Sequence, residues 1–430
     1  MLPPAEFLQI MQQELGENYA GFLKSYNFPP EKAIRVNTLK IPAGEFEKIS
    51  PLTLDGKVPW EERGFYIKDS EGAGRTVEHA MGLYYVQEPS AMSPVPELKI
   101  KRGERVLDLC SAPGGKATQI ASYLQGEGVL VANEPDFKRC QILESNIERT
   151  GVKNCIVTCS TPKALAGHYT EYFDKILVDA PCSGEGMFKK EANALTEWSM
   201  ENVKACALRQ REILEEAYKM LAGGGRMVYS TCTFARQEDE EQIENFLNAH
   251  NDLKLIKMRK LYPHEVRGEG HFYAVLEKQG DERAEPKCAP CTCEKVYEKL
   301  YREWESQTLK IKIPALYQRG TCLYGLFAPM HVPPLGSKIV VKQAGVFLGR
   351  PSADNKRFEI SHTLAMCLRR EEAKCVEVDR DTALKYLRGL TFECGEENGW
   401  RLVICSGHPL GWCKIVNGTA KNHLPKGIRI

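Results

Sequence analysis

Short apolar runs alternate with longer amphipathic stretches through the middle of the chain. Five of the apolar runs predict strands, at 105–109, 128–133, 154–158, 173–179 and 225–231. The stretches between them predict helices, at 116–124, 137–150 and 200–221. Strands that alternate with helices of this length form βαβ units, whose parallel sheet is buried on both faces. The pattern therefore predicts a doubly wound α/β domain over residues 96–277.

The regions next to this pattern predict further elements. Residues 1–95 begin with apolar residues at helical spacing, and short mixed elements follow, so we expect an N-terminal α+β cap. The helical positions are Phe7, Ile10, Met11 and Leu15. Near the end of the central domain, a helix is expected at 237–249. A strand at 271–276 is expected to pair antiparallel at the end of the sheet.

The C-terminal part of the chain has a different pattern. Residues 278–320 are expected to form a linker with a helical segment, because the stretch to about 290 is polar and rich in charge and proline. Short β-like runs at 338–342 and 402–405 are separated by Gly and Pro turns. They predict a mostly β module over residues 321–430.

Composition adds the class of protein and its compartment. The chain is 43% apolar and 27% charged, which excludes disorder over most of its length and a fibrous chain. Its 58 Lys and Arg nearly cancel its 57 Asp and Glu, so the net charge of +1 gives no sign of a nucleic-acid binder. Polar residues interrupt every apolar run of segment 1–20, which predicts neither a secretion signal nor a membrane span. We expect a cytoplasmic monomer whose 16 cysteines are reduced.

The first predicted strand ends in a glycine-rich loop, Cys110-Ser-Ala-Pro-Gly-Gly-Lys116. Ligands of doubly wound sheets lie at the carboxyl ends of the strands, where adjacent glycines let backbone amides approach. The loop lacks the spacing of a phosphate loop or a GxGxxG fingerprint, so neither ATP nor NAD is favoured. The second strand ends at Glu134, whose carboxylate can accept hydrogen bonds from both ribose hydroxyls. This layout is typical of enzymes that use S-adenosylmethionine (SAM); the alternative is a tight turn and a solvated glutamate.

Two cysteines follow the fourth and fifth predicted strands, in DAPCSG at Cys182 and STCT at Cys232. Both thiols are expected to face the same crevice as the glycine-rich loop, where Lys116 can stabilise a thiolate. A thiolate that adds to C6 of a pyrimidine makes an enamine, whose C5 can attack an electrophilic methyl group. Asp179 can bond the amide edge of the ring and stabilise the charge that develops. Spacing does not rank the two thiols, and the absence of a DPPY tetrapeptide argues against adenine-N6 methylation.

Three motifs in chain order, DLCSAPGGK, DAPCSGEGMFKK and YSTCTF, resemble the Nop/Sun family of RNA (cytosine-5) methyltransferases. RVNTLK at 35–40 and YYVQEPSA at 84–91 also resemble this family, so the likeness covers roughly 30–276. The chain is most similar to bacterial 16S ribosomal RNA methyltransferases of the RsmF type, because segment 411–429 resembles their tail. The resemblance implies a Rossmann-like SAM-dependent methyltransferase domain, an N-terminal α+β cap and a C-terminal PUA-like RNA-binding module.

The resemblance also implies roles for individual residues. Cys232 would be the nucleophile that adds to C6, and Cys182 would assist β-elimination and release of the methylated RNA. Asp179 would lie between cofactor and cytosine, and Lys116 would touch the active site. Thr161 stands where many relatives have an aspartate for the adenine amino group, so we expect a weaker contact there or none. The implied cofactor-binding residues are Cys110, Ser111, Ala112, Pro113, Gly114, Gly115, Lys116, Glu134, Thr161 and Asp179.

Two further clusters bear on metals and RNA. Cys288, Cys291 and Cys293 include a CxxC, but no second pair follows at zinc-ribbon spacing, so we expect no metal site. Segment 401–430 has no Asp or Glu and several basic residues, with Trp412 interleaved. They are Arg401, Lys414, Lys421, Lys426 and Arg429, and His423 is interleaved as well. We expect this tail to contact phosphates and stack on bases; the alternative is a solvated basic face.

These features favour one function, SAM-dependent methylation of cytosine C5 in 16S ribosomal RNA through a covalent cysteine–C6 adduct. The expected partner is 16S ribosomal RNA or the 30S subunit, with no membrane. One alternative is a cytosine-5 methyltransferase that acts on transfer RNA. Another is a non-catalytic ribosome-assembly factor that keeps the fold, although intact Cys232, Asp179 and Lys116 count against it.

Overall fold

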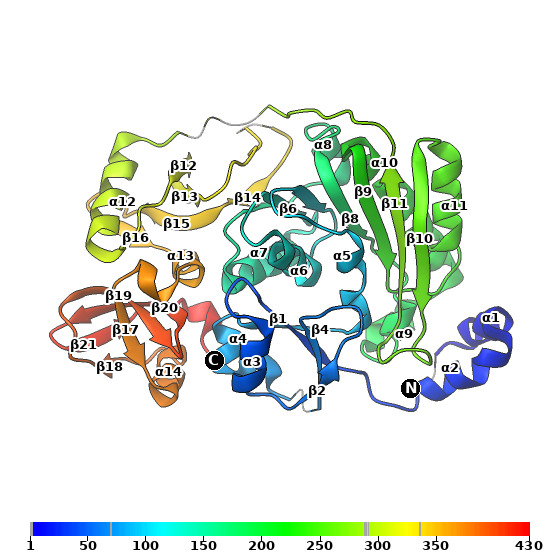
Figure 1. Ribbon diagram of the computed structural model, residues 1–430, viewed down its shortest axis with the longest axis horizontal. Helices are drawn as coiled ribbons and strands as arrows, with labels where there is room; N and C mark the ends of the chain where they lie inside the picture. Colours follow the sequence, from blue (N-terminus) through cyan, green and yellow to red (C-terminus); the bar gives the residue numbers. More distant parts are fainter. Residues whose placement is uncertain (1–2, 69–70, 288–289, 291, 335–336) are drawn as a thin grey trace.

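The computed structural model describes residues 3–68, 71–287, 290, 292–334 and 337–430. An eight-stranded sheet with the order β10-β11-β9-β8-β5-β6-β7-β14 forms its centre, with helices on both faces (Figure 1). The five strands predicted in mid-chain are parallel to one another and confirm the α/β class. They are β5 (Arg105–Asp108), β6 (Val129–Asn133), β7 (Cys155–Thr158), β8 (Phe173–Asp179) and β9 (Leu221–Thr231).

The central strands are apolar on both faces because helices cover both sides of the sheet. Successive side chains of a strand point to opposite faces, so Val106 and Leu107 enter different cores. Val106 packs with α5 (Pro94–Glu97), α6 (Gly115–Leu124) and α7 (Phe137–Thr150). Leu107 belongs to the core that includes α8 (Pro162–Ala166), α10 (Met200–Met220) and α11 (Glu240–Ala249).

The two edges of this sheet hold one confirmed and one wrong prediction. β11 (His271–Lys278) pairs antiparallel with β9, as expected, and β10 (Leu253–Leu261) adds an unpredicted strand outside it. At the other edge, the run expected at 338–342 in the C-terminal module begins instead at Val341. As β14 (Val341–Ala344), it pairs antiparallel with β7 and completes the central sheet. It satisfies backbone groups that an open β7 edge would offer to other chains.

The N-terminal region forms a small antiparallel sheet with the order β2-β3-β1-β4. Its elements are β1 (Ala33–Val36), α3 (Ala43–Ile49), β2 (Leu54–Lys57), β3 (Gly64–Ile67), α4 (Val77–Ala80) and β4 (Tyr84–Gln87). The predicted first helix is α1 (Ala5–Leu15), which buries Phe7 and Met11. With α2 (Tyr19–Ser25), it packs away from the small sheet, against Phe188, Trp198 and Phe234.

The C-terminal half is mostly β, as predicted, but it holds two sheets. α12 (Lys295–Thr308) and β12 (Ala315–Arg319) lie in the segment expected to be a linker with a helix. The first sheet joins β12 to β13 (Cys322–Leu326), β15 (Val346–Pro351) and β16 (Phe358–Ile360). The second has the order β17-β19-β20-β21-β18. Its strands are β17 (Cys375–Val378), β18 (Phe392–Glu393), β19 (Gly399–Cys405), β20 (His408–Val416) and β21 (Thr419–Asn422).

The remaining helices of the C-terminal half are α13 (His362–Cys367) and α14 (Arg380–Leu387), and α9 (Ala192–Glu197) precedes α10 in the central domain. α12 and α13 pack with Trp412 of β20 in one apolar core. Throughout the described residues, every helix is too short or too polar to cross a membrane.

Candidate active site

The carboxyl ends of the central parallel strands surround a cavity of about 1380 Å³. Pockets for a single ligand commonly have about 300–1,000 Å³, so this one has room for a cofactor and a nucleotide base side by side. Tyr85 and Gln87 of β4 bring the N-terminal region into its wall. The predicted site residues that line it are Cys110, Ser111, Ala112, Pro113, Gly115, Lys116, Glu134, Thr161, Asp179, Cys182 and Cys232.

The glycine-rich loop is bound to the sheet by its own backbone and by a serine. The Ser111 N–H donates to the Asn133 carbonyl over 2.7 Å, and its hydroxyl donates to Asp108 Oδ2 over 2.9 Å. Burial raises the pKa of Asp108 to about 7. Gly114, which is absent from the cavity wall, has φ +110°, and a Cβ there would lie 3.2 Å from Leu143 Cδ1. Gly114 therefore allows the sharp turn into α6 beside α7.

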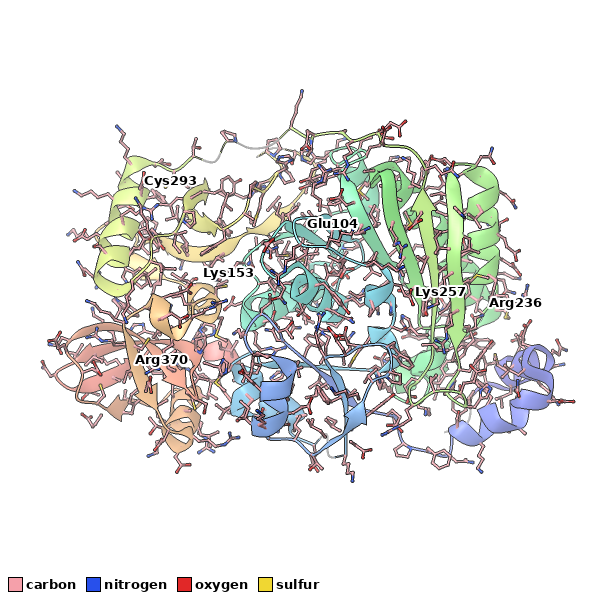
Figure 2. All side chains as sticks on the ribbon, in the orientation of Figure 1. Glu104, Lys153, Arg236, Lys257, Cys293 and Arg370 are labelled. Atoms are coloured by element: carbon pink, nitrogen blue, oxygen red, sulfur yellow. The ribbon has the colours of Figure 1, made fainter. Side chains whose placement is uncertain are left out.

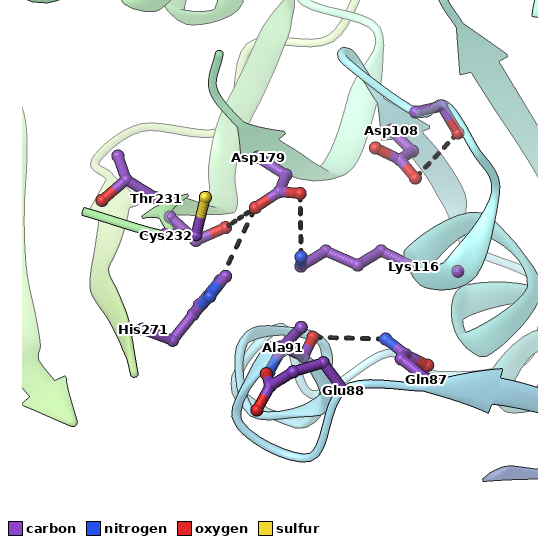
Figure 3. A network of polar contacts seen from close by, with 12 residues as sticks. Gln87, Glu88, Ala91, Asp108, Lys116, Asp179, Thr231, Cys232 and His271 are labelled. Atoms are coloured by element: carbon purple, nitrogen blue, oxygen red, sulfur yellow. Dashed lines mark hydrogen bonds and ion pairs between the residues drawn. The ribbon is translucent and has the colours of Figure 1, made fainter. Parts of the chain in front are cut away.

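Asp179 lies at the centre of the site (Figure 3). Lys116 Nζ donates to Asp179 Oδ2 over 2.8 Å, and the Ser230 hydroxyl donates to Oδ1 over 2.8 Å. His271 Nε2 lies 3.6 Å from the same Oδ1. Burial alone would raise the pKa of Asp179, but Lys116 and His271 together outweigh burial and hold the pKa below its usual range. Asp179 is therefore ionised, and it connects Lys116 of the glycine-rich loop to Ser230 of β9.

The two predicted thiols lie side by side. Their sulfurs are 3.2 Å apart, at the ends of β8 and β9. The contact with Cys232 and then burial raise the pKa of Cys182 well above that of a free thiol. Cys182 therefore keeps its proton at neutral pH, and its S–H lies within donating distance of the Cys232 sulfur. The contact is symmetric, since either sulfur can be the donor, so the separate roles of the two thiols stay a prediction.

Buried carboxylates fasten the two thiol loops to each other. Glu185, after β8, accepts a hydrogen bond from the Phe234 N–H over 2.9 Å. Glu238, after β9, accepts one from the Ser183 N–H over 3.0 Å, and the Ser183 and Thr233 hydroxyls are 2.8 Å apart. Burial raises the pKa of Glu185, and it raises that of Glu238 to about 7. The thiol loops therefore support each other reciprocally.

Glu134 and Thr161 occupy the cavity wall beyond β6 and β7. The buried carboxylate of Glu134 accepts from the Asp136 N–H over 3.0 Å and lies 3.3 Å from Arg139 Nη1. The Thr161 hydroxyl accepts from the Ala164 N–H over 3.3 Å at the start of α8. Thr161 therefore acts as a helix cap, and its hydroxyl proton is left to donate into the cavity.

Comparison with known proteins gives the family. The model for the N-terminal domain of 16S rRNA methyltransferase RsmF matches residues 3–89, that for 16S rRNA methyltransferase RsmB/F matches 95–277, and that for the methyltransferase RsmF PUA domain matches 373–430. Ribosomal RNA small subunit methyltransferase F of Vibrio vulnificus is 32% identical over 98% of this chain and 97% of its own. The chain belongs to the ribosomal RNA small subunit methyltransferase F family. The Shewanella baltica member is 31% identical over 98% of this chain and 96% of its own.

Solved structures agree with this family. A methyltransferase homolog from Pyrococcus horikoshii has a TM-score of 0.56 and 28% identity, over 64% of this chain and 100% of its own. NSun6 from the same organism, solved with SFG, has a TM-score of 0.57 and 24% identity, over 65% of this chain and 99% of its own. They confirm the predicted Rossmann-like fold, and membership in the methyltransferase F family confirms SAM as the cofactor.

Two further residues, Arg35 and His271, support or line the site without having been predicted as site residues. Arg35 is buried, and it donates to the Gly115 carbonyl over 2.8 Å and to Thr118 Oγ1 over 2.7 Å. Arg35 lies in the RVNTLK motif, so this motif could have indicated that Arg35 contributes to the site. His271 is a polar residue at the start of the apolar strand beside β9, and it lines the cavity. Burial lowers the pKa of His271, so its ring is neutral.

The basic tail of this family member differs from the prediction. Trp412 is only 1% exposed and donates its indole N–H to a backbone carbonyl 3.0 Å away, so the expected stacking of Trp412 on a base is wrong. Arg401 is buried as well, which leaves it unable to reach a phosphate. Trp400 is half-buried, 4.4 Å from the His423 ring, and Lys414 Nζ lies 6.0 Å from its centroid.

The cysteine cluster falls mostly outside the described residues, which exclude Cys288 and Cys291. Cys293 lies just before α12 (Figure 2), with its sulfur 3.4 Å from the Glu294 carbonyl. Over the part of the chain that the structure describes, no group of three His, Cys, Asp or Glu side chains is arranged to hold a metal ion.

Proposed function

We propose that this protein transfers a methyl group from SAM to C5 of a cytosine in 16S ribosomal RNA. One observation carries the proposal: two thiols 3.2 Å apart share a cavity with the glycine-rich loop and the ionised Asp179. The curated relatives are named for methylation of small-subunit ribosomal RNA, which supports an RNA substrate.

The residues on the β5–β6 side fit SAM. The loop 110–116 offers backbone amides close to the cavity, because its glycines have no side chain to block that approach. Glu134 is a buried acid at the end of β6, where its carboxylate can accept bonds from ribose hydroxyls. Thr161 can donate its hydroxyl proton to the adenine ring. Bound there, SAM supplies an electrophilic methyl group.

On the β8–β9 side, Cys232 is the nucleophile. Its thiolate forms a bond to C6 of the cytosine, and the electron pair of the C5–C6 double bond becomes available at C5. Negative charge then develops on the polar edge of the ring. Lys116, held by Asp179 at 2.8 Å, donates to this edge, where a preorganised cation stabilises the charge more than water does.

Cys182 assists release of the product. C5 carries both a methyl group and a hydrogen after the transfer, and loss of that proton lets its electron pair restore the double bond and expel Cys232. The S–H of Cys182 passes its proton to the departing Cys232 sulfur 3.2 Å away, and the proton from C5 replaces it. The raised pKa of Cys182 keeps this proton in place until that step.

The test is methyl transfer to 30S subunits, free 16S ribosomal RNA and transfer RNA, with labelled SAM. Label is expected at C5 of a cytidine in 16S RNA, and bisulfite sequencing locates it. C232A should lose both transfer and the covalent adduct. C182A should accumulate the adduct on denaturing gels. A C232A protein that methylates like the wild type would contradict the mechanism, and the reverse adduct pattern would exchange the two cysteines.

A further inference from the structure

An exposed aromatic ring lies beside the cavity. Phe137 is the first residue of α7, and it is 55% exposed. The preceding Asp136 caps the helix by accepting from the Arg139 N–H over 2.8 Å. Arg139 lines the cavity, whereas Phe137 is not part of its wall. The ring therefore lies outside the cavity, one residue along the chain from Asp136 in its wall.

The unexpected edge strand β14 places a cation over this ring. Lys342 Nζ lies 4.6 Å from the Phe137 centroid and 3.7 Å from Glu144 Oε2, with which it forms an ion pair. Val340, just before β14, accepts from the Cys159 N–H over 2.8 Å and donates to the Ser160 hydroxyl over 2.9 Å. These bonds come directly before Thr161 in the cavity wall. A segment from the C-terminal half is thus held firmly against the cavity rim.

Charge differs between the two rims of the cavity. On the α7–α8 side, Arg139 and Lys163 line the wall together with Glu134 and Asp136; Arg139 pairs with Glu134, and Lys163 forms no ion pair with any residue that the structure describes. The rim formed by α9 and α10 is mostly acidic. It carries Glu197, Arg209, Glu212, Glu215 and Glu216. The two cations and two carboxylates of the α7–α8 side balance, whereas carboxylates are in excess on the α9–α10 rim, so a polyanion meets less repulsion on the α7–α8 side.

We propose that Phe137, Arg139, Lys163 and Lys342 form a strip that binds the single-stranded RNA next to the target base, with one flanking base stacked on Phe137. The inference rests on the proposed function, because it takes RNA as the substrate. A base that enters the cavity must leave its stack, so the neighbouring bases are exposed as well. The Phe137 face that Lys342 does not cover accepts any of them. Lys163 contacts the phosphates between them, and Lys342 does so in exchange for its ion pair with Glu144.

The test measures binding of a fluorescein-labelled RNA of about 12 nucleotides, a length in the range that single-strand sites cover, alone and annealed to its complement. F137A is expected to weaken single-strand binding by about 5- to 150-fold, the effect of losing one stacked base. F137W should bind like the wild type. The matched control is I142A, because Ile142 lies on the same helix and is 51% exposed. K342Q should lower the slope of log Kd against log salt by about 0.7.

Three results would overturn the proposal that this strip binds single-stranded RNA. F137A could bind the single strand as well as the wild type does, or I142A could weaken binding as much as F137A. F137A could also leave free RNA binding unchanged and reduce methylation of 30S subunits, in which case the ring contacts a ribosomal protein. The proposed function is tested separately: a wild type that binds the single strand and methylates no ribosomal RNA contradicts that function and leaves the strip intact.

Discussion

The cavity has a cofactor side, at the ends of β5 and β6, and a thiol side, at the ends of β8 and β9. Both sides belong to one sheet but are held by different interactions. The cofactor side is fastened by backbone hydrogen bonds and by Arg35, whose pKa burial lowers to about 10, so it stays charged at neutral pH. The thiol side is fastened by Glu185 and Glu238, whose pKa values burial raises. Each side also holds a carboxyl group whose pKa burial raises to about 7, Asp108 on the cofactor side and Glu238 on the thiol side, so both sides are expected to respond to pH near neutrality.

Asp179 joins the two sides, so its replacement should have the largest effect. D179N keeps the shape but removes the charge that holds Lys116 and Ser230 at 2.8 Å. We expect kcat to fall by about 10³-fold, the effect of losing a preorganised electrostatic group. SAM affinity, measured by calorimetry, should change far less. S230A, which removes one neutral donor, is the matched control and should lower kcat by about 10-fold. A D179N enzyme with near-normal kcat would contradict this role.

The pH response of the thiol side comes second. Because burial raises the pKa of Glu238 to about 7, its stabilising contribution is complete below pH 4 and is lost as pH rises through 7. We expect this group alone to lower the free energy of unfolding by up to about 3 kcal/mol between pH 5 and 8. E238Q should remove that loss in chemical denaturation at several pH values. Asp239, whose pKa burial raises to about 8, is present in both proteins and cancels in the difference. Parallel curves for E238Q and the wild type would refute the assignment.

Arg35 tests the cofactor side, with the smallest expected effect. R35M removes the donors to the Gly115 carbonyl and to Thr118 at the start of α6. The loop then loses preorganisation, and we expect the Kd for SAM to rise about 10-fold. R35K keeps the charge and some of the donors, so its Kd for SAM should lie between those of the wild type and R35M. Because the thiol side is untouched, kcat at saturating SAM should recover in R35M; a kcat that stays low would mean that the two sides are not separable.

Much of the fold could be predicted because its signals are local. The helix at 137–150 and the strand at 173–179 match α7 and β8 residue for residue, since period and apolar run length are properties of the segment itself. The strand with which a given strand pairs is not determined by that segment alone. Nothing in the pattern of β14 indicates that it pairs with β7 rather than with its neighbours in the chain. The burial of Trp412 likewise depends on α12 and α13, which pack over it.

In the candidate site, too, some residues could be located from the sequence and others could not. The glycine-rich loop and the two cysteines could be located because carboxyl ends of parallel strands must meet at one edge. Arg35 reaches this edge from another sheet, and its partners Gly115 and Thr118 are far along the chain. The contact between the Cys182 and Cys232 sulfurs is a three-dimensional property that the spacing of the motifs could not give.

The place of β14 in the chain has a consequence for biosynthesis. The ribosome completes β7 well before it makes Val341–Ala344, and at about 5–20 residues per second the interval is on the order of 10–40 s. During that time the outer edge of β7 is open to strands of other nascent chains. A chain that stops at 278 would keep this edge open permanently. Such a fragment would hold every residue assigned to catalysis and still be expected to aggregate.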